Sequence, residues 1–424
     1  MKDQEQNIFA NIDWKIVITY VLLVCFGWMN IYSAVYDESG AAIMDFSRQH
    51  GKQLIWIAVA FVTAIFILII DSRFFSSTAY FIYGAILVLL VVVLFTASVT
   101  KGATSWISIG SFKLQPSEFA KFATALTFAK YLSSIDVDMK NGRTKMMASI
   151  IILVPALLVL LQHDTGSALV FAGFLLPFFR EGLSGIILVI GVVAAIIFVL
   201  ALAFNKYIVI ALLLAVLLGY IFLWLTKSKR TLRNILKPIG VFVCCCMFVF
   251  SVDFVFENVL EPHQKDRIYV LLGKSNDPRG IDYNVNQSKI AIGSGELLGK
   301  GFLNGTQTKY NFVPEQETDF IFCTVGEEWG FVGSAVLIAA YLYLLIHLIT
   351  MADRQRSRFA RIYGYSVASI FFVHFTINIG MVLGLLPVIG IPLPFFSYGG
   401  SSLIAFTLML FVFVRQDAVH NQII

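Results

Sequence analysis

Long apolar segments separated by short polar ones run through most of this chain. Apolar runs of about 17 to 25 residues recur, the length of helix that crosses roughly 30 Å of hydrocarbon. They are too long and too continuous for the alternating strands of a membrane barrel. The pattern predicts an all-α, polytopic helical membrane protein with about 10–12 transmembrane helices, in one integral membrane domain over residues 1–424. The expected spans are approximately 14–34, 52–70, 77–97, 118–133, 147–161, 166–180, 184–204, 207–226, 238–256, 320–349, 361–384 and 401–415. The short pair 147–161 and 166–180 predicts two thin helices that meet inside the bilayer.

The composition agrees with this pattern. Of the 424 residues, 58% are hydrophobic and 13% are charged, and the mean hydropathy is +0.82, whereas a soluble domain carries roughly 25% charged residues. The net charge of +5 does not indicate nucleic-acid binding, because the Lys and Arg residues lie between apolar runs. The five cysteines lie within or beside apolar runs and show neither metal-ligand spacing nor a disulfide framework.

The short basic loops predict the orientation. Segments 134–146, 227–237 and 354–361 are rich in Lys and Arg, and such loops face the cytoplasm. The long segment 257–317 holds seven Lys and Arg residues, but long segments obey this rule less strictly. With both termini in the cytoplasm, four polar or irregular stretches fall together on the outer face, which predicts a site open to that side: 98–117, 162–166, 257–317 and 385–401.

The motif QPSEFAKF begins a helix, because Pro and Ser favour helix starts. Glu118 and Lys121 are three residues apart and pair on one face. One interpretation is a self-neutralised pair that eases a helix end into lipid. The other is an ionisable pair that faces a cavity, where a helix start beside a Lys suits a phosphate.

Asp164 in the motif LQHDTGSALV is costly at membrane depth unless it is solvated or paired. Its alternative role is to cap the helix that begins near Thr165. Both interpretations stay open on the sequence alone.

The loop 257–317 is the long polar insert of the chain, and a loop of this length is functional or disordered. Asp277 precedes Pro278 and Gly280, which predicts a turn. Gln287, Ser288 and Lys289 open an amphipathic stretch. The glycines that follow do not form a dinucleotide-binding fingerprint.

The motif PEQETDFIF predicts a helix start with Thr318 as the N-cap and Asp319 in the first turn. Glu327 and Glu328 cannot both face lipid, so either the span begins near Phe331 or these carboxylates line an interior cavity.

The segment GLLPVIGIPLPFFSYGGSS contains three prolines and a Gly-Gly pair that interrupt any helix. Non-helical backbone at membrane depth survives only where it is buried in protein or faces water. A re-entrant segment that walls the outer cavity fits this pattern, and a tight extracellular turn is the alternative.

Four motifs together resemble the SEDS family (shape, elongation, division and sporulation): QPSEFAKF, QSKIAIGSGELLGKGFLNGTQ, VPEQETDFIF with GEEWG, and PFFSYGGSS. The resemblance covers nearly the whole chain, and GTQ at 305–307 is more similar to the rod-shape branch, RodA, than to the division branch, FtsW. It implies a peptidoglycan glycosyltransferase that polymerises lipid II on the outer face of the bacterial inner membrane. It also implies a class B penicillin-binding protein as partner, together with other membrane proteins of the elongation complex.

The resemblance places the family's essential acid in an Asp-Pro turn, which is Asp277 here. The chain departs from the family at Gln162-His163-Asp164, where Gln-Pro-Asp is usual, and in about two additional spans within 184–256, an added hairpin that leaves the large loop outside. The expected substrate-binding residues are Arg48, Gln115, Ser117, Glu118, Lys121, Asp164, Gln287, Ser288, Lys289, Thr318, Asp319, Ser397 and Ser401.

The implied chemistry is attack of a sugar hydroxyl on an anomeric carbon, with a lipid pyrophosphate as leaving group. Asp277 is expected to act as general base, and Lys121, Lys289 and Arg48 are the candidate cations that offset charge on the pyrophosphate. A divalent cation, Mg or Mn, is an alternative source of that charge, although no ligand cluster specifies one. The competing hypotheses are a lipid II flippase, because transporters also use broken helices, and a non-catalytic scaffold for the transpeptidase.

Overall fold

The structure is a computed structural model, and it describes residues 11–36, 45–96, 105–109, 112–224, 232–258, 265, 269, 281–310 and 312–419. Two compact units make up the chain. The larger unit combines residues up to Leu183 with those from Asn284 onward, and the smaller unit spans Ser184–Tyr283. Each unit is described by itself below.

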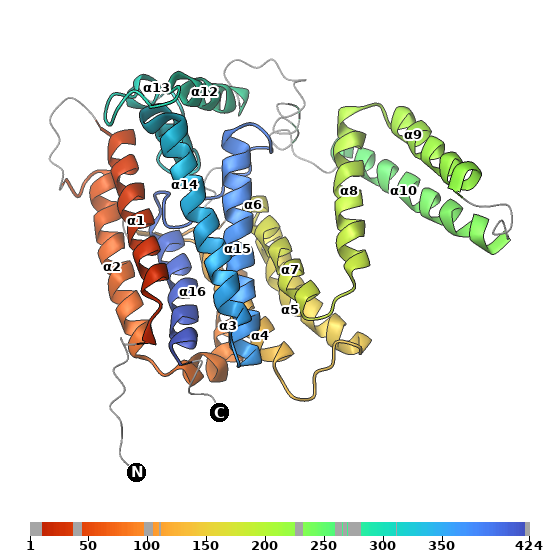
Figure 1. Cartoon of the computed structure of the whole chain (residues 1–424), viewed down its shortest axis with the longest axis horizontal. Helices are drawn as coiled ribbons and strands as arrows, with labels where there is room; N and C mark the ends of the chain where they lie inside the picture. The colour runs from red at the N-terminus through yellow and green to blue at the C-terminus, as the bar shows by residue number, and fades with distance from the viewer. Residues whose placement is uncertain are drawn as a thin grey trace, which may run out of the picture. The chain divides into compact units, whose positions relative to one another are not determined.

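Most of the larger unit consists of helices that lie side by side (Figure 1). α16 packs against α2, α3 against α4, α14 against α15, and α15 against α4. The elements of this unit are α1 (Trp14–Ala34), α2 (Gln49–Ile69), α3 (Ser72–Thr96), β1 (Ile107–Ile109), β2 (Phe112–Leu114), α4 (Pro116–Leu132), α5 (Gly142–Leu161), α6 (Thr165–Val170), η2 (Phe171–Phe174), α7 (Leu175–Arg180), α13 (Thr306–Lys309), α14 (Ile321–Asp353), α15 (Arg358–Val382) and α16 (Gly400–Ala418). α12 (Ile281–Ser294) begins at the boundary between the units.

The smaller unit contains α8 (Gly185–Ala203), α9 (Lys206–Gly219), the π-helical turn η3 (Tyr220–Trp224) and α10 (Leu232–Asn258). Its helices share a small apolar core of Ile197, Val209 and Val249. Lys206 and Asp253 join α9 to α10 with an ion pair of 2.8 Å. Most other apolar side chains of α8 are exposed, as expected for helices surrounded by lipid.

The predicted fold class is confirmed. Among the described residues, ten helices are long and apolar enough to cross a membrane, and the apolar stretch Thr165–Arg180 is shorter. α4, of 17 residues, corresponds to the expected span 118–133. The prediction of a thin helix at 147–161 is wrong, because α5 has 20 residues and begins at Gly142, where the Asn141 side chain accepts a hydrogen bond from the Arg143 amide.

α14 is broken near its start. Gly330 has φ +63° and ψ −159°, a backbone conformation open essentially only to Gly. The break releases backbone groups of α14, and the loop after α12 pairs with them. The amides of Lys300 and Gly301 donate to the carbonyls of Glu327 and Glu328, each at 3.0 Å. The sequence alternatives for this region were a later start or an interior cavity, whereas the structure shows a kinked helix that is completed by a docked loop.

Residues 385–399 form the expected re-entrant segment. The Phe395 ring lies 5.1 Å from the ring of Tyr20, which is about 21 Å along α1 from Ala34 at 1.5 Å per residue. Tyr341 of α14 donates a hydrogen bond of 2.5 Å to the carbonyl of Pro394. Its later part, from Ile391 to Ser397, is therefore largely buried among helices, where irregular backbone is tolerated, and only the part near Leu385 is exposed.

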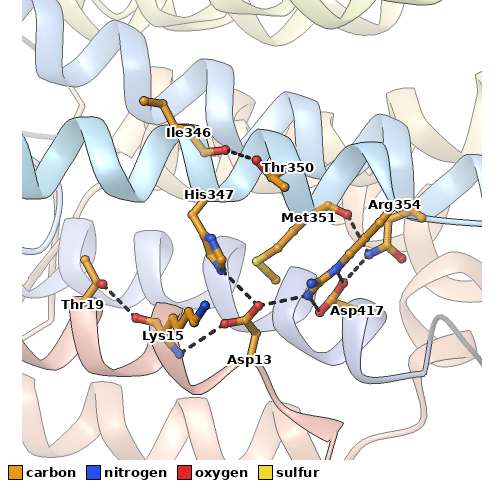
Figure 2. Close-up of polar contacts among 10 residues, drawn as sticks. Asp13, Lys15, Thr19, Ile346, His347, Thr350, Met351, Arg354 and Asp417 are labelled. Carbon is orange, nitrogen blue, oxygen red and sulfur yellow. Dashed lines mark hydrogen bonds and ion pairs between the residues drawn. The ribbon is translucent and has the colours of Figure 1, made fainter.

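A polar cluster joins three helices at the end of the larger unit where α1 begins (Figure 2). Asp13 receives hydrogen bonds of 3.0 Å from His347 and from Arg354 of the α14 region. Arg354 also pairs with Asp417 of α16, and Gln355 donates to the same carboxylate at 2.6 Å. This end is called the Asp13 end, and the opposite end, where α1 finishes, is called the α13 end.

Candidate functional site

Asp277, the expected catalytic residue, lies outside the described residues. The chain is described again from Ile281, the first residue of α12. α12 is tied to the larger unit by Ser288, whose hydroxyl donates a hydrogen bond of 3.0 Å to the carbonyl of Val382 in α15. Lys289 is exposed, and its side chain lies over Gly384, where a Cβ would overlap it. The side chain of Gln287 is half-buried.

Four of the expected substrate-binding residues form one cluster at the starts of α4, α6 and α16. The Gln115 amide group donates to Asp164 at 2.8 Å, and the Ser117 hydroxyl donates to the same carboxylate at 3.3 Å. Ser401 accepts from the Gln115 backbone amide at 3.3 Å and donates to the carbonyl of Lys113 at 3.1 Å. Asp164 also caps α6, so both sequence interpretations of this residue apply at once.

Glu118 and Lys121 form the predicted pair, and both side chains are buried. Lys121 Nζ lies 2.7 Å from Glu118 Oε1 and 2.8 Å from His374 Nε2. His374 Nδ1 lies 3.0 Å from the carbonyl of Pro392. Because a carbonyl only accepts and an ammonium only donates, Nδ1 carries the proton of a neutral imidazole and Nε2 accepts from Lys121. Lys121 has 0% relative exposure, which corrects its expected place as an open cation on the outer face.

Thr318 and Asp319 do not begin a helix. α14 starts at Ile321 with Phe320 as N-cap, and the Thr318 hydroxyl donates to the carbonyl of Glu315 at 3.2 Å instead. The prediction of an N-cap was wrong because residues of later segments hold this backbone. Ser397 donates to the Thr318 carbonyl at 2.6 Å, and Asn378 of α15 donates to the Asp319 carbonyl at 2.8 Å.

A cavity of about 640 Å³ opens at the α13 end, between the end of α1, the start of α2 and α13. Two basic side chains, Arg48 and Lys309, line it together with Tyr36 and Tyr310. Arg48 also forms an ion pair of 3.6 Å with Asp45. The size suits part of a ligand, and the two basic groups favour an anionic one.

Glu327 is a buried carboxylate that contacts α13, the helix whose last residue, Lys309, lines this cavity. Its Oε1 lies 2.7 Å from Lys300 Nζ, and its two oxygens accept from the backbone amides of Gln307 and Thr308, each at 2.9 Å. The neighbouring Glu328 accepts a hydrogen bond from Ser33 of α1. The two carboxylates thus hold the loop before α14 and the end of α1.

Sequence reasoning missed three polar residues that the structure brings into these contacts: Lys309, His374 and Asn378. A signal was present for two of them, because His374 and Asn378 stand four residues apart within an apolar helix, and polar residues in such helices usually have a function or a partner. The described residues contain no group of three or more His, Cys, Asp or Glu side chains placed to hold a metal ion.

Buried polar clusters within long apolar helices, a re-entrant segment and a basic cavity at one end define a multi-pass helical membrane protein with a candidate site at the α13 end. The family model for FtsW, RodA and SpoVE, described as "Cell cycle protein", matches residues 13–217 and 177–422. The chain belongs to this family.

Two relatives are similar over most of the chain. The peptidoglycan glycosyltransferase RodA of Treponema pallidum (strain Nichols) is 31% identical, over 96% of this chain and 98% of that protein. The peptidoglycan glycosyltransferase MrdB of Escherichia coli (strain K12) is 33% identical, over 88% of this chain and 86% of that protein. A solved chain, from work described as "Structural coordination of polymerization and crosslinking by a peptidoglycan synthase complex", aligns with a TM-score of 0.68 and 25% identity, over 97% of this chain and 98% of that one.

Proposed function

We propose that this protein is a peptidoglycan glycosyltransferase of the cell-elongation type, which polymerises lipid II into glycan strands. The observation that carries the proposal is similarity over nearly the full length to two peptidoglycan glycosyltransferases at 31% and 33% identity. The RodA and MrdB relatives favour the elongation branch over the division branch, FtsW.

We place the protein in the bacterial inner membrane, with both termini in the cytoplasm and the α13 end facing outward. The basic loops 134–146 and 227–237 support this orientation through the positive-inside rule. The Asp13 end, where α1 begins and α16 ends, then faces the cytoplasm. The polar cluster around Asp164, the basic cavity and the large loop then share the outer side, where lipid II is used.

Asp277 is the proposed general base. It takes the proton from the acceptor sugar hydroxyl as that oxygen attacks the anomeric carbon of the donor, and the bond to the lipid diphosphate breaks. A positioned carboxylate base contributes about 10²–10⁴-fold to such a reaction. Asp277 lies four positions before Ile281 in the chain, a separation that spans at most about 14 Å when fully extended.

Arg48 is the proposed cation for the departing diphosphate, because it lines the basic cavity with Lys309. A preorganised positive charge there stabilises the leaving group as its negative charge develops. Lys121 is paired and buried, so its contribution would be to hold α4 and α15 in place near the substrate, while Lys289 remains accessible on α12.

A class B penicillin-binding protein is the proposed partner, which crosslinks the strands made here. The solved relative from a complex that coordinates polymerization and crosslinking supports this assignment.

The test is polymerisation of lipid II by the purified full chain in detergent, with the cognate transpeptidase present. The wild type should make glycan, and Asp277→Asn should make none while inserting normally in the membrane. Asp282→Asn, a carboxylate change at the start of α12, is the matched control and should remain active. Glycan synthesis by the Asp277→Asn variant would reject the assignment of the base.

The same assay separates the competing functions. Detergent has no leaflets, so a flippase would produce no glycan there. A scaffold would produce none either, but its Asp277→Asn variant would still support growth of cells that depend on it.

A further inference from the structure

The carboxylate of Glu327 is completely enclosed and receives only donors. The side chain has 0% relative exposure. Oε1 accepts from Lys300 Nζ at 2.7 Å, from the Gln307 amide at 2.9 Å and from the Thr306 hydroxyl at 3.2 Å, and Oε2 accepts from the Thr308 amide at 2.9 Å. An ionised carboxylate accepts on both oxygens and offers no proton, so the set of donors around Glu327 suits its ionised form.

Three of these donors, from Thr306, Gln307 and Thr308, belong to the first turn of α13. The amides of Gln307 and Thr308 belong to the start of this single-turn helix, whose N-cap, Gly305, supplies no side chain of its own. A helix that short has no stability in isolation. Gln316 also holds α13 against the end of α1, since its amide group donates to the carbonyls of Thr308 and Ala34, each at 2.7 Å. The position of α13 therefore depends on Glu327, which belongs to another helix.

The end of α13 lines one side of the basic cavity. Lys309 is its last residue and Tyr310 follows it, and both line the cavity opposite Arg48. A displacement of this turn would separate the two basic groups. Misplacement of a binding group by about 1 Å costs up to about 10²-fold in activity.

We propose that Glu327 is a positioning residue for substrate binding: it fixes α13 so that Lys309 stands opposite Arg48 and the cavity accepts the diphosphate of a lipid-linked substrate. This inference rests on the proposed function. Glu327 does not touch the reacting atoms. It acts through the backbone of Gln307 and Thr308.

The first experiment compares the kinetics of three variants in the detergent assay. Glu327→Gln keeps the size but turns an NH₂ group toward backbone donors, so KM for lipid II should rise about tenfold or more, with a smaller change in kcat, because ground-state binding is lost. Glu327→Asp keeps the charge and should give an intermediate KM. Glu296→Gln is the matched control, since this glutamate is exposed on the loop between α12 and α13, and its kinetics should equal those of the wild type.

A double-mutant cycle then tests whether Glu327 acts through Lys309. Lys309→Met alone should raise KM, and adding it to Glu327→Gln should raise KM by less than the product of the two single effects, because the turn is already displaced. Fully multiplicative effects, or a Glu327→Gln variant with KM within about twofold of the wild type, would overturn the inference.

Hydrogen exchange supplies a readout that does not need catalysis. The amides of Gln307 and Thr308 should exchange about tenfold faster or more in Glu327→Gln, because they lose their acceptor, and amides of α15 should be unchanged. If the wild type makes no glycan, the proposed function fails. Binding of a polyprenyl diphosphate, followed by tryptophan fluorescence, then replaces KM, and an unchanged dissociation constant in Glu327→Gln overturns the inference.

Discussion

The buried pair of Glu118 and Lys121 allows a prediction whose size follows from the structure. Lys121 has 0% relative exposure, and its acceptors are Glu118 Oε1 at 2.7 Å and His374 Nε2 at 2.8 Å. At an effective dielectric constant of about 20, the attraction between charges at that first distance is about 6 kcal/mol. Removing one partner of such a pair costs about 3–5 kcal/mol, because the remaining charge is buried alone.

Glu118→Gln should therefore lower the free energy of unfolding by about 3 kcal/mol, at the lower end of that range, because the amide oxygen can still accept from Lys121. Glu118→Leu combined with Lys121→Met removes both charges, which is often neutral or stabilising. That double variant leaves Nε2 of His374 without its donor, at a cost of about 1–3 kcal/mol, so it should lie within about 2 kcal/mol of the wild type.

The assay is SDS-induced unfolding of the purified protein, followed by tryptophan fluorescence. The reasoning is refuted if Glu118→Gln is as stable as the wild type, or if the double variant is less stable than Glu118→Gln. Lipid II polymerisation by the double variant then separates stability from chemistry. A stable but inactive protein would show that the charges serve the reaction.

Two further predictions concern the backbone of α14 and the Asp13 end. Gly330→Ala should destabilise the protein by about 1–3 kcal/mol or more in SDS titration, because the φ of +63° at this position suits only Gly. The control is Gly191→Ala in α8, where a Cβ meets nothing within 4 Å, and this variant should stabilise the protein by up to about 1 kcal/mol. Equal changes in stability for the two variants would contradict this account. Burial alone raises the pKa of Asp13, but hydrogen bonds and charges from His347 and Arg354 outweigh it and hold that pKa below the usual 3.8. The stability from Asp13 should then be complete above pH 3.8 and lost as the pH falls below it, and Asp13→Asn should remove this acid-dependent part of the melting curve.

The helices could be predicted from the sequence because their signals are local. Apolar runs marked most spans, and Asp164 was identified as a cap of α6, whereas the start of α5 at the Asn141 cap, before its apolar run, was missed. The pairing of Glu118 with Lys121 was also visible, since it depends only on a spacing of three residues. The activity was predicted from the resemblance of four sequence motifs to one family, and the pattern of apolar runs alone did not indicate it.

The arrangement of the site depends on partners that are distant in sequence. The burial of Lys121 is stabilised by His374, 253 residues later, and the non-helical backbone at Thr318 is held by Ser397, 79 residues later. Local preference favoured an N-cap at Thr318, and tertiary hydrogen bonds overrode it. The role of Asp277 stays a prediction.

The break at Gly330 ties the assembly of one helix to a loop. The carbonyls of Glu327 and Glu328 receive their hydrogen bonds from Lys300 and Gly301, and a carbonyl left without a donor in hydrocarbon is costly. That loop precedes α14 in the chain, so the ribosome has already made it when α14 enters the membrane. The first turns of α14 consequently complete their backbone hydrogen bonds only when the preceding loop has closed over them, so the assembly of this helix cannot be separated from the folding of that loop.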